Sequence, residues 1–142
     1  TLALIPYSGM AVSSDKGAKN DVHPTNKKAP AERLARWALN KTYGLSVVPS
    51  GPLPLSANYA DGQLKISFNH LAGGLKTVDG QSLSGFSTDG KNKVSAVISG
   101  KYVIIISEKK PTYVYYGWKP FSDGNLVNSE NLPASTFSLK VR

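Results

Sequence analysis

An acidic residue and a histidine lie two positions apart near the start of the sequence, in the segment Asp21-Val22-His23-Pro24. Histidine is the usual general base of enzymes, because the unperturbed pKa of its imidazole lies close to neutral pH. A neighbouring carboxylate fixes the tautomer of the imidazole and stabilises the imidazolium that forms when the ring takes a proton. Asp21 and His23 therefore have the residue types of the acid and base of a hydrolytic triad.

The same spacing also has a structural interpretation. Asp21 is placed to act as the N-cap of a following helix, and His23 can be a partly exposed loop residue. A pair as short as Asp-x-His occurs often by chance. The spacing alone therefore leaves both interpretations open, and it identifies no substrate-binding residue.

The residue types give little support for a metal site or a phosphate-binding loop. His70 is the only other histidine, we interpret it as structural, and the chain contains no cysteine. Two histidines on opposite sides of Gly44, where the chain changes character, do not make a metal site without thiolates, so we expect no metal and no cofactor. The glycine-rich segments near 70–75 and 123–126 lie between expected strands, which is not the strand-to-helix context of a phosphate loop.

The charge of the chain is strongly positive but dispersed. Its 142 residues include 17 Lys and Arg against 9 Asp and Glu, a formal net charge of +8. Only three basic residues are arginines, and the lysines are scattered rather than gathered along one helix, so we expect no nucleic-acid partner. The longest apolar run, 102–106, has the length of a strand, so we also expect no membrane span.

The positions of the apolar residues divide the chain into two parts at Gly44. In the segment 31–43, Leu34, Trp37 and Leu39 recur at helical spacing, and Pro30 requires either a kink or a regular helix that begins there. One such helix cannot bury its apolar stripe unaided. We therefore expect residues 1–44 to be the end of a larger domain, and the chain to be processed or to be a subunit of something longer.

Residues 45–142 predict an all-β domain. After the Pro-rich segment 46–54, alternating or continuous apolar runs indicate strands. The runs lie at 55–60, 63–70, 93–100, 102–107, 112–118 and 137–141. About seven short strands without a second helix favour an antiparallel β-sandwich.

Three ordered segments resemble the C-terminal portion of the sialate O-acetylesterase family of SGNH hydrolases. Residues 8–44 are similar to the last catalytic-domain segment, with a Gly-Met-Ala-Val strand, an Asn-Asp-x-His-Pro loop and a final helix. Residues 51–75 resemble the linker and first hairpin of a C-terminal β-domain. Residues 113–137 resemble the family's ending, in Asn-Leu-Val-Asn and Leu-Pro-Ala. Tyr115 and Gly117 depart from it, standing where Arg and Ala are usual.

The resemblance implies a mixed fold: a C-terminal remnant of an α/β SGNH hydrolase domain (strand, loop, helix; 1–44), followed by an antiparallel β-sandwich (45–142). It makes His23 the catalytic base and Asp21 its orienting acid. The serine nucleophile would lie outside this chain, in an N-terminal catalytic portion or a companion chain. The implied substrate is an O-acetylated glycan, with sialic acid as the expected sugar and export to the cell exterior, the periplasm or a lumen as the expected location.

A rival prediction makes the β-sandwich a non-catalytic module that binds a glycan or docks a partner. Tyr113, Tyr115 and Trp118 are candidates for a sugar-stacking platform, since alternation places only one of Tyr115 and Tyr116 outward. A third interpretation is that the β-domain only braces the catalytic domain. Saturable glycan binding would distinguish the rival from both others.

Overall fold

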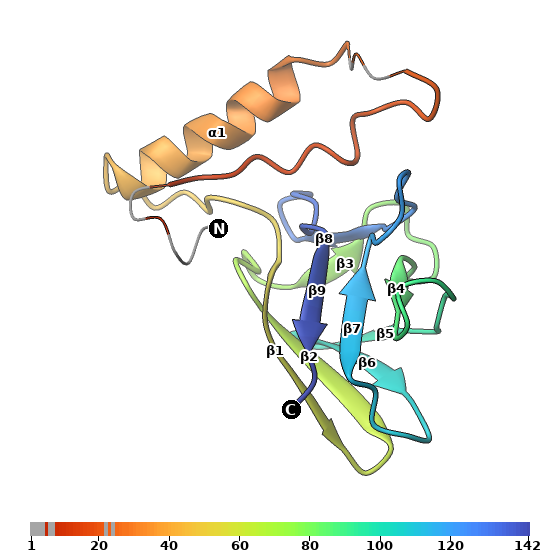
Figure 1. Ribbon diagram of the computed structural model, residues 1–142. Helices are drawn as coiled ribbons and strands as arrows, with labels where there is room; N and C mark the ends of the chain where they lie inside the picture. The colour runs from red at the N-terminus through yellow and green to blue at the C-terminus, as the bar shows by residue number, and fades with distance from the viewer. Residues whose placement is uncertain (1–4, 6–7, 22, 24) are drawn as a thin grey trace. The chain divides into compact units, whose positions relative to one another are not determined.

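Helix α1 (Lys28–Lys41) is the main element of the first half of the chain (Figure 1). The computed structural model describes residues 5, 8–21, 23 and 25–142, and α1 is the only α-helix among them. Pro30 lies in its first turn, where a backbone N–H has no partner within the helix, so proline is tolerated without a kink. The Asn26 Oδ1 accepts a hydrogen bond from the Ala29 backbone N–H at 3.0 Å and so stabilises this end of the helix.

The helix buries less of its apolar stripe than its spacing predicts. Trp37 is its only buried residue, and its indole N–H donates to the Met10 carbonyl at 2.9 Å. The Leu34 side chain is 51% exposed within this chain. Of the stripe residues, only Trp37 is therefore buried by the described residues.

The strand expected at 9–12 does not form. Residues 8–13 pair with no strand in the described part of the chain, and two of their carbonyls accept side-chain hydrogen bonds. The Met10 carbonyl binds the Trp37 indole, and the Val12 carbonyl binds the Arg33 guanidinium. This corrects the "strand" of the predicted strand–loop–helix remnant.

The chain divides into two units, 1–50 and 51–142. The first unit includes the segment that follows the helix, which is hydrogen-bonded to it, and the domain boundary expected after Gly44 stays a prediction. The Arg36 guanidinium donates to the Val48 carbonyl at 2.9 Å. The Asn40 amide donates to the Val47 carbonyl at 3.0 Å.

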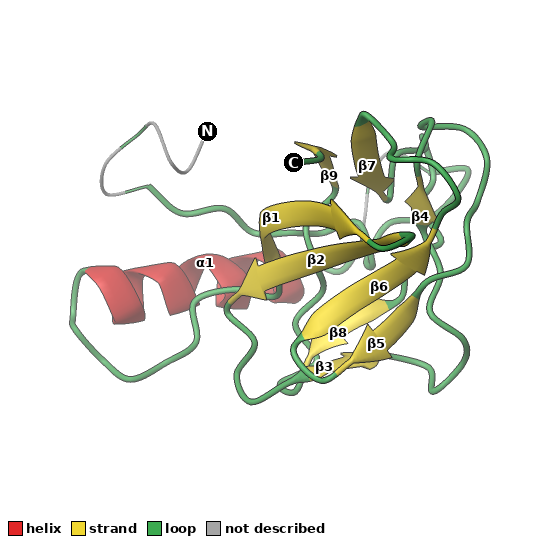
Figure 2. Ribbon diagram, turned by 90° about the horizontal axis from the view of Figure 1, so that it is seen from below, coloured by secondary structure: helices red, strands yellow, loops and turns green. Residues whose placement is uncertain are grey.

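Three antiparallel sheets make up the second unit, and Figure 2 shows the largest with its strands side by side. One sheet has the order β1-β2-β6-β5, another is the pair β3-β8, and the last has the order β4-β7-β9. The bounds are β1 Leu53–Ala60, β2 Gln63–Asn69, β3 Leu75–Thr77, β4 Phe86–Ser87, β5 Val97–Ser99, β6 Tyr102–Ile106, β7 Tyr113–Tyr116, β8 Leu126–Asn128 and β9 Phe137–Lys140. The unit is thus β-rich and antiparallel, as the sequence predicts.

The core of this unit joins side chains from all three sheets. Ile66 of β2, Leu126 of β8 and Phe137 of β9 share one buried cluster. The Phe68 and Phe137 rings meet edge to face, with 6.0 Å between centroids. Burial raises the pKa of Tyr116 to about 12, and its hydroxyl oxygen accepts a hydrogen bond from the Leu126 N–H at 2.9 Å. The core therefore accommodates both the aromatic ring of Tyr116 and its hydroxyl group.

Most expected strands appear with small shifts. The predicted hairpin between β1 and β2 turns at Asp61 and Gly62, both of which have positive φ, as a tight two-residue hairpin requires. The run at 93–100 forms only the short β5. No helix in the described residues is long and apolar enough to cross a bilayer.

Candidate functional site

Asp21 and His23 contact each other in the loop before α1. The Asp21 Oδ1 accepts a hydrogen bond from the His23 backbone N–H at 2.8 Å and lies 3.8 Å from the imidazole Nδ1. The shorter contact shapes the loop. The longer one exceeds hydrogen-bond distance, so the carboxylate and the imidazole are neighbours without a hydrogen bond between them. Val22 and Pro24 of the predicted motif lie outside the described residues.

Asp21 does not cap the helix. The residue that receives a hydrogen bond from the first turn of α1 is Asn26, through the Ala29 N–H. Asp21 instead closes its own turn, in which its N–H also bonds to the Ala18 carbonyl at 3.4 Å. The structural alternative raised from the sequence, an Asp21 N-cap, is therefore not what the structure contains.

Both side chains are open to solvent in this chain. The His23 side chain is 89% exposed and that of Asp21 is 53% exposed. Hydrolytic triads work with their acid and base largely enclosed, because exclusion of water strengthens each electrostatic interaction. The pair is thus accessible to solvent, and no described residue encloses it.

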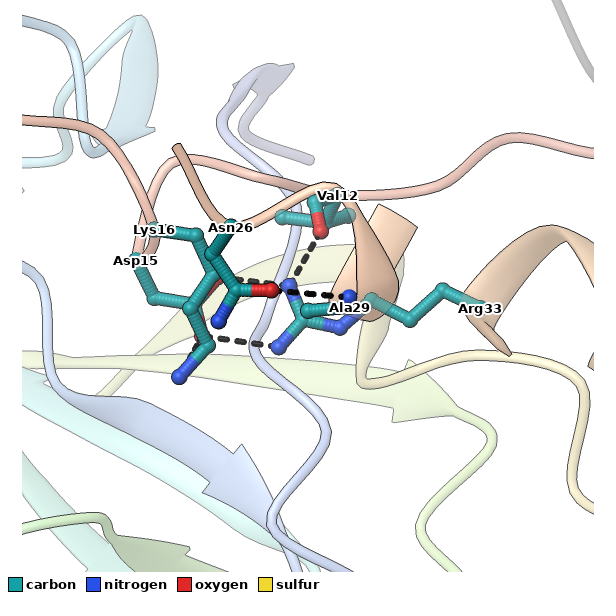
Figure 3. Close-up of polar contacts among 6 residues, drawn as sticks. All are labelled: Val12, Asp15, Lys16, Asn26, Ala29 and Arg33. Carbon is teal, nitrogen blue, oxygen red and sulfur yellow. Dashed lines mark hydrogen bonds and ion pairs between the residues drawn. The ribbon is translucent and has the colours of Figure 1, made fainter. Parts of the chain in front are cut away.

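An ion pair ties the start of the loop to the helix behind it (Figure 3). The Arg33 guanidinium donates to both carboxylate oxygens of Asp15, at 2.6 and 2.7 Å, and also to the Val12 carbonyl. The Arg33 side chain is only 12% exposed. Together with the Asn26 contact to Ala29, this pair anchors both ends of the segment that carries Asp21 and His23.

Asp15 is held in its charged form. Burial alone would raise its pKa, but the hydrogen bond and the positive charge of Arg33 outweigh that effect and lower the pKa below its usual value. Sequence reasoning missed this pair, because the two residues are far apart along the chain and no motif links them. Only complementary charge could have suggested it.

The described residues supply no nucleophile for the pair. No serine among them is in hydrogen-bond contact with the His23 imidazole, whose described polar partner is Asp21. No cluster of potential metal ligands occurs in the described part of the chain either. The site is thus an acid and a base without the group that they would activate.

A second candidate site lies in the β unit, where Tyr113, Tyr115 and Trp118 form a continuous group that we call the aromatic row. The ring centroids of Tyr113 and Tyr115 are 6.1 Å apart, and those of Tyr115 and Trp118 are 5.6 Å apart. Tyr113 and Trp118 are 38% and 52% exposed, whereas Tyr116 is buried. The predicted alternation, with one of the adjacent tyrosines inward, agrees with this arrangement.

One of three comparisons with known proteins finds a similar protein. No protein-family model matches the sequence, and no curated protein is significantly similar to it. A solved structure that resembles the chain is XAC1771 of Xanthomonas citri, described as a novel carbohydrate acetylesterase, with 33% identity and a TM-score of 0.79. The match covers 89% of this chain and 31% of that one, so this chain spans about a third of its relative. This likeness supports a relationship to carbohydrate esterases.

Proposed function

We propose that the chain is part of a serine carbohydrate O-acetylesterase, to which it contributes His23 as the general base and Asp21 as the orienting acid. The observation that carries the proposal is the likeness to a carbohydrate acetylesterase over most of this chain. The matched length exceeds that of either unit alone. Residues of both units therefore have counterparts in that enzyme.

The chemistry is acyl transfer through a covalent intermediate. The His23 imidazole takes the proton of a serine hydroxyl as the serine oxygen attacks the acetyl carbonyl. The imidazolium then gives that proton to the departing sugar oxygen, and a water molecule, deprotonated by His23 in turn, hydrolyses the acetyl-serine to acetate. The serine and the oxyanion donors belong to a catalytic portion or companion chain outside this sequence.

Asp21 has to move closer to the imidazole for this role. Its carboxylate is 3.8 Å from Nδ1, and hydrogen bonds of catalytic residues are often long before substrate is bound. Both residues are exposed in this chain, so contact with the serine-bearing portion would bury them and favour the shorter contact. The expected substrate is an O-acetylated glycan, with acetylated sialic acid as the first sugar to test and acetylated xylan as the alternative.

The test is made on the native assembly that contains this chain and its serine-bearing portion. His23→Ala is expected to abolish acetate release from acetylated glycans and labelling by a fluorophosphonate probe, while the assembly stays folded by circular dichroism. His70→Asn is the matched control. It removes the other imidazole, and asparagine tolerates the positive φ of 59° at that position.

Asp21→Asn separates the two roles of the carboxylate. The asparagine oxygen can still accept the His23 N–H and preserve the turn, but the negative charge is lost. Loss of the equivalent charge in serine proteases lowers kcat about 10⁴-fold, and a large decrease is expected here. An unchanged rate would reduce Asp21 to a loop-shaping residue, and full activity of His23→Ala would refute the proposed site.

A further inference from the structure

The aromatic row rests on a loop that is fixed by its own hydrogen bonds. Gly90 lies beneath the rings: a side-chain carbon there would be 3.4 Å from the Trp118 ring and 3.8 Å from that of Tyr115. The Gly90 N–H donates to the Ser87 hydroxyl. The Asp89 carboxylate accepts hydrogen bonds from the Lys91 and Asn92 N–H groups, both at 2.8 Å. The surface is therefore organised before any ligand arrives, which lowers the entropy cost of binding.

Lysines surround the row. Lys91, Lys93 and Lys119 line a pocket together with Trp118. Lys140 of β9 lies directly across from Tyr113 of β7 in the register of the two strands. All four lysines are exposed.

The two carboxylates in this region already have partners. Asp123 forms an ion pair with Lys93, and Asp89 is engaged by the backbone of its own turn. Both carboxylates keep their negative charges, and Asp123 also interacts electrostatically with Lys119. The four lysines outnumber the two carboxylates, so the net charge offered to a ligand is positive.

The geometry of the rings limits the shape of a ligand. Adjacent rings are inclined by 39° and 51°, so the row is not a flat plane. Rings inclined to one another cannot all lie against a flat stack of polysaccharide chains. They can contact successive sugar units of a single twisted polysaccharide chain, one unit at each ring. Tyrosine and tryptophan suit such contacts because their rings are apolar while their polar tips stay in water.

We propose that the aromatic row and its lysines bind a single, soluble polysaccharide chain that carries carboxylate groups. The rings would contact the apolar faces of the sugars, and Lys91, Lys119 and Lys140 would pair with their carboxylates. The choice of a glycan rests on the proposed carbohydrate esterase function. Aromatic rings and lysines also occur in single-stranded nucleic-acid sites, so an RNA ligand is an outcome to be tested.

Calorimetric titration of residues 1–142 tests the proposal with three probes: a galacturonic-acid oligosaccharide, its methyl ester and an oligouridylate. We expect the free acid to bind more tightly than the ester, with an affinity that falls as salt rises. Neither sugar carries an acetyl ester, so failure of the esterase proposal and failure of this one are distinguishable.

Variants locate the site. Trp118→Ala is expected to weaken binding of the acid by at least about tenfold, whereas Tyr43→Ala, which removes a 70%-exposed tyrosine elsewhere, should leave it unchanged. Replacing Lys91 and Lys119 by Gln should weaken binding of the free acid but not binding of the methyl ester. The same change at Lys41 and Lys109 is the charge-matched control.

Four binding results would overturn the inference, and a fifth outcome, self-association, would do so as well. The four are absence of binding to the acid, equal binding of acid and ester, an unaltered affinity in Trp118→Ala, and tighter binding of the oligouridylate. Self-association that Trp118→Ala disperses, without sugar binding, would instead make this face an interface between copies and would equally refute the glycan site.

Discussion

At the scale of single residues, the pair Asp21–His23 depends on groups that do no chemistry themselves. The imidazole and carboxylate sit on an exposed loop, and such a loop loses precision unless its ends are fixed. Arg33 and Asp15 fix one end, and Asn26 fixes the other. The Arg33 side chain is nearly enclosed, so its bidentate contact has a defined geometry that an exposed lysine could not supply.

The ionisation of Asp15 should make the stability of the first unit depend on pH. Its folded pKa is lowered, so its contribution is present above the unfolded value of about 3.9 and is lost as pH falls through the folded value. Asp15→Asn should lower the free energy of unfolding by about 0.5–1 kcal/mol near pH 7, a small value because the side chain is partly exposed. Near pH 2 the variant and the parent should converge.

The measurement is urea unfolding followed by Trp37 fluorescence, in a Trp118→Phe background that removes the other tryptophan. Glu108→Gln serves as the control, because it removes an exposed carboxylate from the second unit. A difference between Asp15→Asn and its parent that is as large in acid as at neutral pH would show that shape, and not charge, accounts for the effect.

At the scale of elements, the end of β7 determines where the aromatic row points. Alternation along β7 buries Val114 and Tyr116 and leaves Tyr113 exposed. Gly117 then adopts φ of +62°, and Trp118 emerges on the surface instead of continuing the strand. The resembled family usually has Ala at this position. The conformation seen here favours glycine for two reasons: the positive φ, and the closeness of the Thr136 and Ser122 side chains.

Gly117→Ala is expected to destabilise the β unit beyond the backbone cost of about 1–2 kcal/mol. The added carbon would lie 2.8 Å from the Thr136 Cγ2 and 2.9 Å from the Ser122 Oγ, so both side chains would have to shift. Gly80→Ala is the matched control, since Gly80 has a similar φ of +69° and no atom within 4 Å of the added carbon. Thermal unfolding compares them, and equal losses would show that packing contributes nothing at Gly117.

At the scale of the whole molecule, two buried asparagines connect loops that are distant in sequence. The Asn128 amide donates to the His70 carbonyl, and its oxygen accepts from the N–H groups of Glu130 and Leu132. The Asn125 amide donates to Asp79, and its oxygen accepts from the Ser84 N–H. These are the two asparagines of the Asn-Leu-Val-Asn motif, which therefore has a structural role in holding the β unit together.

Asn128→Leu should be severely destabilising. Asn128 is fully buried, and the leucine would leave a carbonyl and two N–H groups without the partners that they have now. We expect a loss of about 3 kcal/mol or more in the free energy of unfolding, measured with urea. Asn58→Leu, at an exposed position of β1, should change stability little. Similar small losses in both variants would contradict the role assigned to Asn128.

The sequence by itself determined the periodic elements of this protein. The alternation in β2 and the continuous apolar run of β6 predicted those strands closely, because burial of one face imposes a period on the residues. The helix was also predicted. It begins at Lys28, two residues before the beginning at Pro30 that the sequence offered. The Asp21–His23 pair was predicted from residue type and spacing, since both members lie in one short segment, and its catalytic role stays a prediction.

Only the tertiary structure decided the features that depend on residues far apart. The short strands β3, β4 and β8 carry too few residues to show a period, and their partners supply their hydrogen bonds. The segment at 9–12 looks like a strand in sequence, yet its carbonyls bind Trp37 and Arg33. The Asp15–Arg33 pair and the lysines around the aromatic row come together only on folding, because local spacing carries no information about contacts between distant segments.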